Sequence, residues 1–238
     1  MSEWKMKRFW TETTVAETDA GFTVHLDGRA IRTPGKSRLN VPTRALAEAM
    51  CAEWEAQDGE VRPESMPVTK AANSAIDKVT PQFAEVADML AGYGETDLLC
   101  YRAAKPDALQ RRQAEAWDPL LDWCRDSYDA PLLQIEGVMY QPQPQASLQR
   151  LRARVHQLDA FALTGFHELV TLPGSLVLGL AVYDGHISAE DAWDISRIDE
   201  RFQQEQWGVD EDAEAAAEAK KAGLLAGWRF CQMVRPSA

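Results

Sequence analysis

The sequence has few of the residues and spacings that metal and redox sites need. Its 238 residues include four cysteines and four histidines, and no two cysteines have the C-x-x-C spacing of a zinc or redox motif. Cysteines so far apart indicate reduced, mostly buried thiols and a cytosol-like compartment. His167-Glu168 begins like the H-E-x-x-H motif of a zinc protease, but Thr171 stands where the second histidine belongs. We therefore expect no metal site.

Motifs for phosphate binding and covalent catalysis are also missing. Pro173-Gly174-Ser175 opens an apolar helix, whose N-terminus could hold an anion. Without a phosphate-binding loop, a dinucleotide fingerprint or a G-x-S-x-G motif, close packing between helices is the better interpretation. Glu95 with Asp97, or Asp199 with Glu200, could carry acid–base chemistry if buried together. Neighbouring helical residues point ~100° apart, so Asp199 and Glu200 would not share one site, and we expect neither a cofactor nor an enzyme.

Long apolar runs and excess positive charge are absent as well. The longest apolar run, residues 176–183, is interrupted by Gly179 and is too short to cross ~30 Å of hydrocarbon. The first ten residues are polar and charged and show no signal or transit peptide. The net charge of -12 disfavours nucleic acid and anionic lipid as partners. We therefore expect a soluble, cytoplasmic protein without membrane insertion.

The negative charge that is present gathers near the C-terminus. Between Asp184 and Glu218, 12 acidic residues stand against only Arg197 and Arg201. The first 38 residues instead hold seven Lys or Arg against five Asp or Glu. This polarity indicates an acidic C-terminal surface that is either simply solvated or meets a basic partner.

Periodicity predicts β-structure in the first ~42 residues. Phe22, Val24 and Leu26 alternate with polar residues, which is typical of a half-buried strand. Asp27-Gly28 then favours a hairpin, because both turn residues need positive φ. The other strands are expected over residues 30–33 and 39–42.

Helical spacing begins at Thr43, a predicted N-cap, with Leu46, Met50 and Trp54 on the inner face of a helix that reaches residue 56. Later helices are expected over residues 69–79, 81–93, 108–128, 146–166, 174–183, 188–207 and 211–230. Residues 132–140 should be extended and could return to the N-terminal sheet. The predicted fold class is α+β, with a small β-rich domain over residues 1–68 and a larger helical domain over residues 69–238.

The chain is rich in tryptophan, with eight in 238 residues. Most should belong to the core, and a minority could be exposed anchors, because tryptophan is favoured at protein interfaces. The pattern alone does not sort them. Those in the expected helical domain are Trp117, Trp123, Trp193, Trp207 and Trp228.

Several short motifs, in their order along the chain, together resemble one known family. They are Lys7-Arg8-Phe9-Trp10, Leu26-Asp27-Gly28-Arg29, Thr33-Pro34-Gly35-Lys36, Val41-Pro42-Thr43, Glu53-Trp54, Met66-Pro67-Val68-Thr69, Ala72-Asn73-Ser74-Ala75-Ile76-Asp77, Glu95-Thr96-Asp97-Leu98-Leu99-Cys100-Tyr101-Arg102, Trp117-Asp118-Pro119-Leu120, Gly174-Ser175, Asp199-Glu200-Arg201-Phe202-Gln203 and Trp207-Gly208. Each is weak alone, but together, from about residue 7 to 208, they resemble the ATP synthase assembly chaperones numbered twelve in yeast nomenclature.

The resemblance implies a chaperone for assembly of the ATP synthase catalytic head. It would bind the unassembled alpha subunit, as a monomer and without a cofactor, and shield its subunit interface until a beta subunit takes its place. The family's functionally important acidic position resembles Glu200, with Asp199 as the neighbouring possibility. An important family tryptophan resembles Trp54, which we interpret as structural. Beyond Gly208 the sequence departs from the family, so no binding role is carried over to that segment.

Two other functions stay open from the residues alone. One is a small-molecule hydrolase that uses carboxylates in an interdomain cleft, and the other is an acidic scaffold or docking module. A hydrolase predicts several polar groups that converge in a deep pocket. A chaperone predicts a broad face without such convergence, because covering a surface needs area and shape rather than chemistry.

Overall fold

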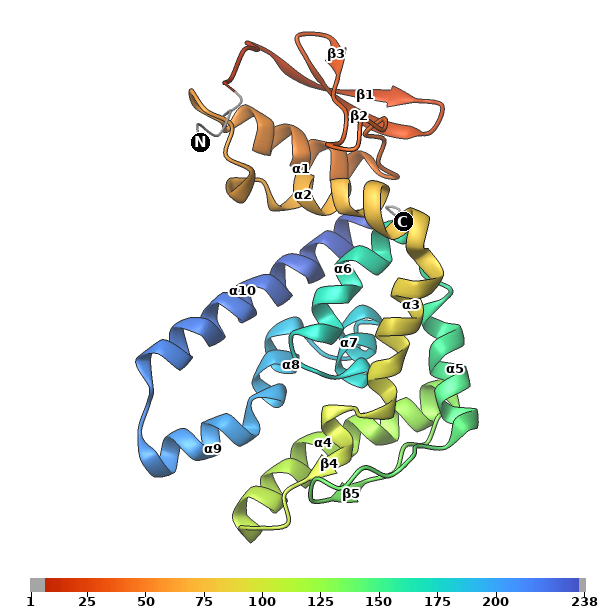
Figure 1. Cartoon of the computed structure of the whole chain (residues 1–238), viewed down its shortest axis with the longest axis vertical. Coiled ribbons are helices and arrows are strands. Elements are labelled where there is room, and N and C mark those ends of the chain that lie inside the picture. Colours follow the sequence, from red (N-terminus) through yellow and green to blue (C-terminus); the bar gives the residue numbers. More distant parts are fainter. Residues whose placement is uncertain (1–6, 236–238) are drawn as a thin grey trace. The chain divides into compact units, whose positions relative to one another are not determined.

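The structure, a computed structural model, describes residues 7–235, and most of them are helical (Figure 1). Within that range one unit comprises residues 7–83, 160–164 and 229–235, and a second comprises residues 84–159 and 165–228. A small sheet in the first unit and helices in the second confirm the predicted α+β class. Residues 1–6 and 236–238 of the predicted domains lie outside the described residues. The predicted domain boundary after residue 68 stays a prediction.

The first unit is built on a three-stranded antiparallel sheet. Strands β1 (Thr13–Thr18), β2 (Gly21–Leu26) and β3 (Arg29–Ala30) lie in the order β1-β2-β3. The predicted hairpin is confirmed, since Asp27 and Gly28 have φ angles of 47° and 75°. The expected strand over residues 39–42 is wrong in extent. It is reduced to one bridge between Phe22 and Val41, because the following residue, Pro42, has no N–H to continue a ladder.

Helix α1 (Arg44–Glu55) packs on β1 and β2. Thr43 caps it as predicted, because its hydroxyl oxygen accepts the N–H of Leu46 at 3.3 Å. Leu46 and Met50 are fully buried. The Thr43 hydroxyl also donates to the carbonyl of Met233, which ties the start of α1 to the end of the last helix.

Short helical pieces complete the first unit, and longer helices form the second. The former are η1 (Pro63–Ser65), α2 (Pro67–Ser74), the π-helical η2 (Ala75–Val79) and η3 (Thr80–Gln82). The latter are α3 (Phe83–Gly92), η4 (Tyr93–Glu95), η5 (Leu98–Cys100), α4 (Asp107–Tyr128), α5 (Gln145–Val155), α6 (Ala160–Thr171), α7 (Leu176–Tyr183), α8 (Ala189–Ser196), α9 (Ile198–Trp207) and α10 (Glu211–Val234). Helices α6 and α10 each contribute residues to both units.

Helix α7 forms the centre of the second unit. Residues 176–182 are all buried, and α7 contacts α4, α8 and η4 (Figure 1). Gly179 lets α6 approach, since a Cβ at this position would lie 2.6 Å from the Val170 side chain. The interpretation of this segment as a closely packed helix is thereby confirmed.

Three sequence predictions fail in the second unit. The extended segment 132–140 contains β5 (Ile135–Glu136), which pairs in parallel with β4 (Tyr101–Arg102), so its suggested return to the N-terminal sheet is wrong. The expected helix 146–166 is divided into α5 and α6. The expected helix 188–207 is divided into α8 and α9, because the Ser196 hydroxyl donates to the Trp193 carbonyl at 2.7 Å and Arg197 leaves helical geometry.

An ion pair joins α3 and α5 in the second unit. Asp88 accepts hydrogen bonds from the Arg152 guanidinium at 2.7 and 2.9 Å, and its Oδ1 lies 2.6 Å from Nε2 of His156. Bonding to Arg152, and then to His156, lowers the pKa of Asp88 from 3.8 to about 2.

We expect this pair to contribute stability above about pH 4 and to lose that contribution as pH falls toward 2. The direction follows because the unfolded aspartate takes up its proton at a higher pH than the folded one. Urea unfolding from pH 5 to 2 should therefore show a smaller loss of stability in Asp88→Asn than in the wild type. Equal pH slopes in the two proteins would contradict this assignment.

Candidate functional site on helix α9

Helix α9 carries Asp199 and Glu200, and none of its residues is fully buried. One face of the helix lies against α4. Asp199 accepts a hydrogen bond from Nε2 of Gln113 at 2.6 Å. The Arg112 guanidinium lies over the Phe202 ring at 5.2 Å and pairs with Glu205 at 2.8 Å. This face therefore holds α9 to the rest of the second unit, and Asp199 belongs to it.

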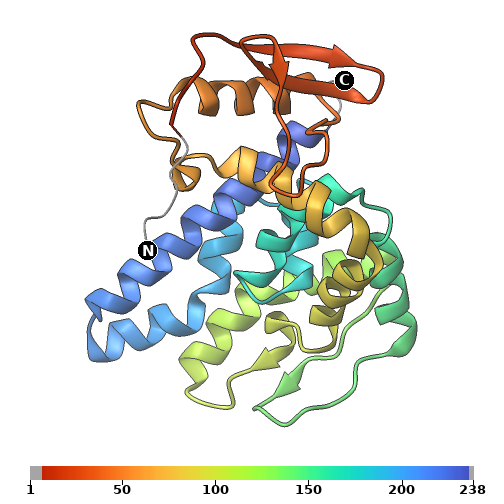
Figure 2. The same cartoon turned by 45° about the horizontal axis from the view of Figure 1, so that its top comes forward.

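A second face of α9 borders a small cleft that it shares with α8 and α10. Figure 2 shows α9 and α10 as two blue helices joined by a short turn. The cleft has a volume of about 50 Å³, far below the roughly 300–1,000 Å³ of a typical ligand pocket. Its walls are Trp193, Arg197, Arg201 and Gln204 on one side and Glu214, Ala217, Glu218 and Lys221 on the other.

Charged and polar side chains around this cleft form ion pairs, hydrogen bonds and cation–π contacts with their neighbours. Arg201 pairs with Asp194, and Gln204 donates to Glu214 at 3.0 Å. Arg197 lies over the Trp193 ring at 5.6 Å. The cleft is thus an internal polar contact rather than a place for a small-molecule substrate.

The third face of α9 points away from α4 and lies beside the cleft. At ~100° per residue, Glu200, Gln203 and Trp207 share this face. The Glu200 side chain is 45% exposed and forms an ion pair with Arg197 at 2.7 Å. Adjacent carboxylates therefore have different surroundings, since Asp199 bonds to α4 and Glu200 faces outward. That Glu200 serves a partner stays a prediction.

Trp54 lies in the first unit, in the last turn of α1. It is half-buried rather than largely buried as its helical register predicts, and it packs edge-on against the buried Trp10 with ring centroids 5.3 Å apart. Its neighbour Glu53 accepts the backbone N–H groups of Val68 and Thr69 at 2.7 and 2.8 Å, which caps α2. These contacts favour a structural role for Trp54, which stays a prediction.

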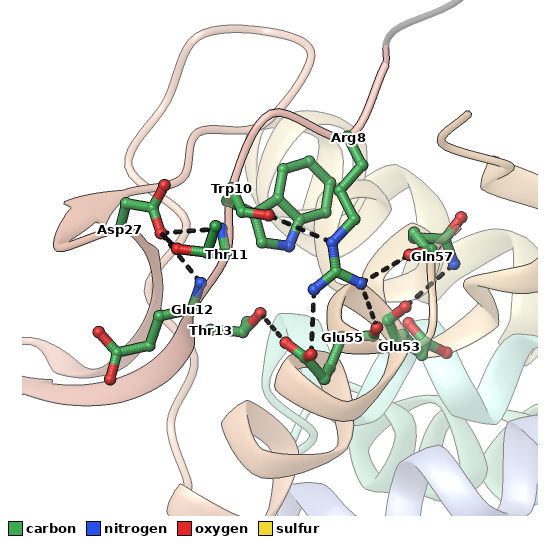
Figure 3. Close-up of polar contacts among 9 residues, drawn as sticks. All are labelled: Arg8, Trp10, Thr11, Glu12, Thr13, Asp27, Glu53, Glu55 and Gln57. Carbon is green, nitrogen blue, oxygen red and sulfur yellow. Dashed lines mark hydrogen bonds and ion pairs between the residues drawn. The ribbon is translucent and has the colours of Figure 1, made fainter. Parts of the chain in front are cut away.

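Arg8 fastens the segment before β1 to the end of α1 (Figure 3). Its guanidinium donates to the carbonyls of Glu55 and Gln57, both at 2.7 Å, and to the Trp10 carbonyl at 3.2 Å. It also pairs with the Glu55 carboxylate at 3.0 Å. The cation thus satisfies carbonyls that a helix C-terminus leaves unpaired. The Lys7-Arg8-Phe9-Trp10 motif drew attention to this segment, but sequence reasoning missed the contact.

The second carboxylate pair considered from sequence does not converge either. Asp97 is fully buried and accepts from the Ser175 hydroxyl at 2.6 Å and from the N–H groups of Leu99 and Val177 at 3.0 Å. Desolvation raises the pKa of Asp97. Glu95 instead accepts from the Tyr140 hydroxyl at 2.7 Å. Asp97 therefore joins η5 to the start of α7 and has no nearby acid–base partner in Glu95.

The thiols and potential metal ligands likewise form no reactive cluster among residues 7–235. Cys100, Cys124 and Cys231 are buried, and Cys51 is half-buried. Burial raises the pKa of Cys124 to about 12 and raises that of Cys100, so both remain protonated thiols at neutral pH. In the same range no three His, Cys, Asp or Glu side chains are placed to hold a metal ion. No helix there is both long enough and apolar enough to cross a bilayer.

Comparison with known proteins gives a consistent result. A family model described as ATP12 chaperone protein matches residues 7–125. The chain is 24% identical over 221 residues to the mitochondrial protein atp12 of Schizosaccharomyces pombe, covering 87% of this chain and 75% of that protein.

Solved structures are similar over nearly the whole chain. Atp12 from Paracoccus denitrificans is 52% identical, with a TM-score of 0.95 and coverage of 98% of this chain and 100% of the other. A mutant of that protein, with lysine in place of an aspartate, matches with a TM-score of 0.96, the same identity and the same coverage. A chaperone candidate from Agrobacterium tumefaciens is 36% identical, with a TM-score of 0.91 and coverage of 97% and 87%.

Proposed function

Because the chain belongs to the ATP12 chaperone family, whose members assist ATP synthase assembly, we propose that it binds the unassembled alpha subunit of the catalytic head. It would shield the surface that the alpha subunit later presents to a beta subunit. An unpaired subunit exposes a large contact surface and is prone to aggregate. Covering that surface needs a stable complementary face and no chemical step.

The observation that carries this proposal is the outward face of α9. Helix α9 is fixed to α4 through its opposite side, so Glu200 is presented by a supported element without contributing to the core. In the sequence, the acidic excess between Asp184 and Glu218 lies on both sides of α9. A carboxylate held in this way suits a basic group on a partner.

Surroundings of the face also favour a protein partner over a small molecule. The adjoining cleft, at about 50 Å³, is too small for a typical small-molecule ligand. We further propose that the chain acts in the bacterial cytoplasm, a location supported by its high similarity to a protein of the bacterium Paracoccus denitrificans. We also propose that it acts as a monomer. Family membership implies a non-enzymatic role.

We expect Glu200→Lys to weaken binding of the alpha subunit by about 2 kcal/mol or more, because it places a cation opposite a basic group. Stability should change by less than about 0.5 kcal/mol, since Glu200 is partly exposed and outside the core. The measurement is recovery of soluble complex after co-expression with the alpha subunit, at low and moderate salt.

The matched control is Glu115→Lys, which makes the same charge change at an exposed position of α4. It should leave recovery unchanged. Equal recovery of complex with the Glu200 variant and the wild type at both salt concentrations would remove Glu200 from the binding face. Failure of the wild type itself to form a complex would reject the proposed function.

A further inference from the structure

Trp207 is the last residue of α9 and is 82% exposed. Every other tryptophan between residues 7 and 235 is buried or half-buried. Val209, two residues later, is 64% exposed. The fold therefore gains little from either side chain, and the two place apolar surface at the corner between α9 and α10.

A backbone hydrogen bond and the Asp210 side-chain carboxylate fix this corner in place. Gly208, with a φ of 91°, ends α9, and its N–H donates to the Gln204 carbonyl at 2.8 Å. Asp210 then accepts the N–H groups of Asp212 and Ala213 at 3.0 and 3.1 Å, which begins α10. The indole thus projects from an ordered turn, so binding through it would lose little conformational entropy.

Carboxylates and no cations flank the exposed indole in the sequence. Between Phe202 and Ala219 there is no lysine or arginine. Exposed Asp210, Glu211 and Asp212 follow the corner. Glu200 precedes Trp207 by seven residues, which places both on the same face of α9. The apolar tip therefore has an acidic rim.

This rim determines which occupant fits. Nucleic acid and anionic lipid are repelled by it, and a second copy would bring like charges together. A protein surface with an apolar pocket and surrounding lysines or arginines is complementary to both the indole and the rim.

We propose that Trp207 is the apolar anchor of the client contact and inserts into a basic-rimmed apolar pocket on the alpha subunit. The inference rests on the proposed function and extends it from a single carboxylate to a face with a central indole. Trp is among the residues that most often dominate binding energy at interfaces. Glu200 then belongs to the polar rim of the same contact.

The test compares Trp207→Ala and Trp207→Phe with the wild type by calorimetric titration of the purified alpha subunit. Truncation to alanine should weaken binding about 30-fold or more, and phenylalanine should restore part of it. Met89→Ala, which removes another exposed apolar side chain on α3 with 47% exposure, is the matched control and should bind like the wild type. Thermal melts should be unchanged in the two Trp207 variants.

Binding by Trp207→Ala within about threefold of the wild type would overturn the anchor while leaving the proposed function intact. A wild type that does not bind the alpha subunit would reject both. Two further results would assign a different occupant and so overturn the proposal. They are Trp207-dependent self-association in sedimentation velocity and Trp207-dependent pelleting with phosphatidylcholine vesicles.

Discussion

Replacement of Asp97 by alanine is expected to lower the free energy of unfolding by about 3–5 kcal/mol. The carboxylate accepts the Ser175 hydroxyl and two backbone N–H groups in a fully buried position. Alanine would leave all these donors without an acceptor and away from water. Because Ser175 in turn caps α7, the start of the central helix would lose its fixed geometry.

Urea unfolding of Asp97→Ala, with Ser175→Ala beside it, measures this effect. The serine variant removes one donor and the cap and should lose only about 1–2 kcal/mol. Asp97→Asn retains the shape but turns an N–H₂ group toward other donors, so an intermediate loss is expected. A loss below about 1 kcal/mol for Asp97→Ala would show that water or a shifted backbone satisfies these donors.

Trp117→Ala is expected to lower the free energy of unfolding by a similar amount, about 3–5 kcal/mol. The indole is fully buried on α4, with the Arg102 guanidinium 5.2 Å from its ring centroid. Its Nε1–H donates to the Ile195 carbonyl at 3.0 Å. Ile195 lies near the end of α8, three residues before α9 begins. Loss of this hydrogen bond should therefore also disturb the face of α9 that carries Glu200.

The control is Trp117→Phe, which keeps an aromatic ring but removes the N–H donor. It should lose about 1–3 kcal/mol. At a temperature where both variants are folded, Trp117→Phe should also bind the alpha subunit more weakly than the wild type. An unchanged melting temperature for Trp117→Ala would mean that neighbouring side chains fill the space, and would contradict the role assigned to the indole.

Features set by a few adjacent residues could be predicted from the sequence. The turn at Asp27-Gly28 depends on local dihedral preferences, and the cap at Thr43 depends on a side-chain oxygen three residues before the N–H that it accepts. The partner of β5 and the break at Arg197 could not be predicted. The pairing of β5 with β4 joins segments that lie far apart in the sequence, whereas the break at Arg197 follows a local bond from Ser196 to Trp193 that the helical pattern does not encode.

In the candidate site, too, some features follow from the sequence pattern and others do not. Helical phase predicts that Glu200 points away from the core, and the structure agrees. The bond of Asp199 to Gln113 could not be read from the pattern, because it depends on how α9 packs on α4. Trp207 follows Glu200 by seven residues and shares its helical phase, so its 82% exposure agrees with the same pattern.

The first unit also has a consequence for the order of events on the ribosome. Its sheet and α1 are complete within the first 83 residues, but residues 229–235 belong to the same unit, and Met233 accepts a bond from Thr43. Roughly 150 residues of synthesis separate them, or about 7–30 s at ~5–20 residues per second. During that time the sheet and α1 lack residues 229–235, which complete their unit. The chaperone would therefore finish its own fold only at the end of synthesis, before it could protect another protein.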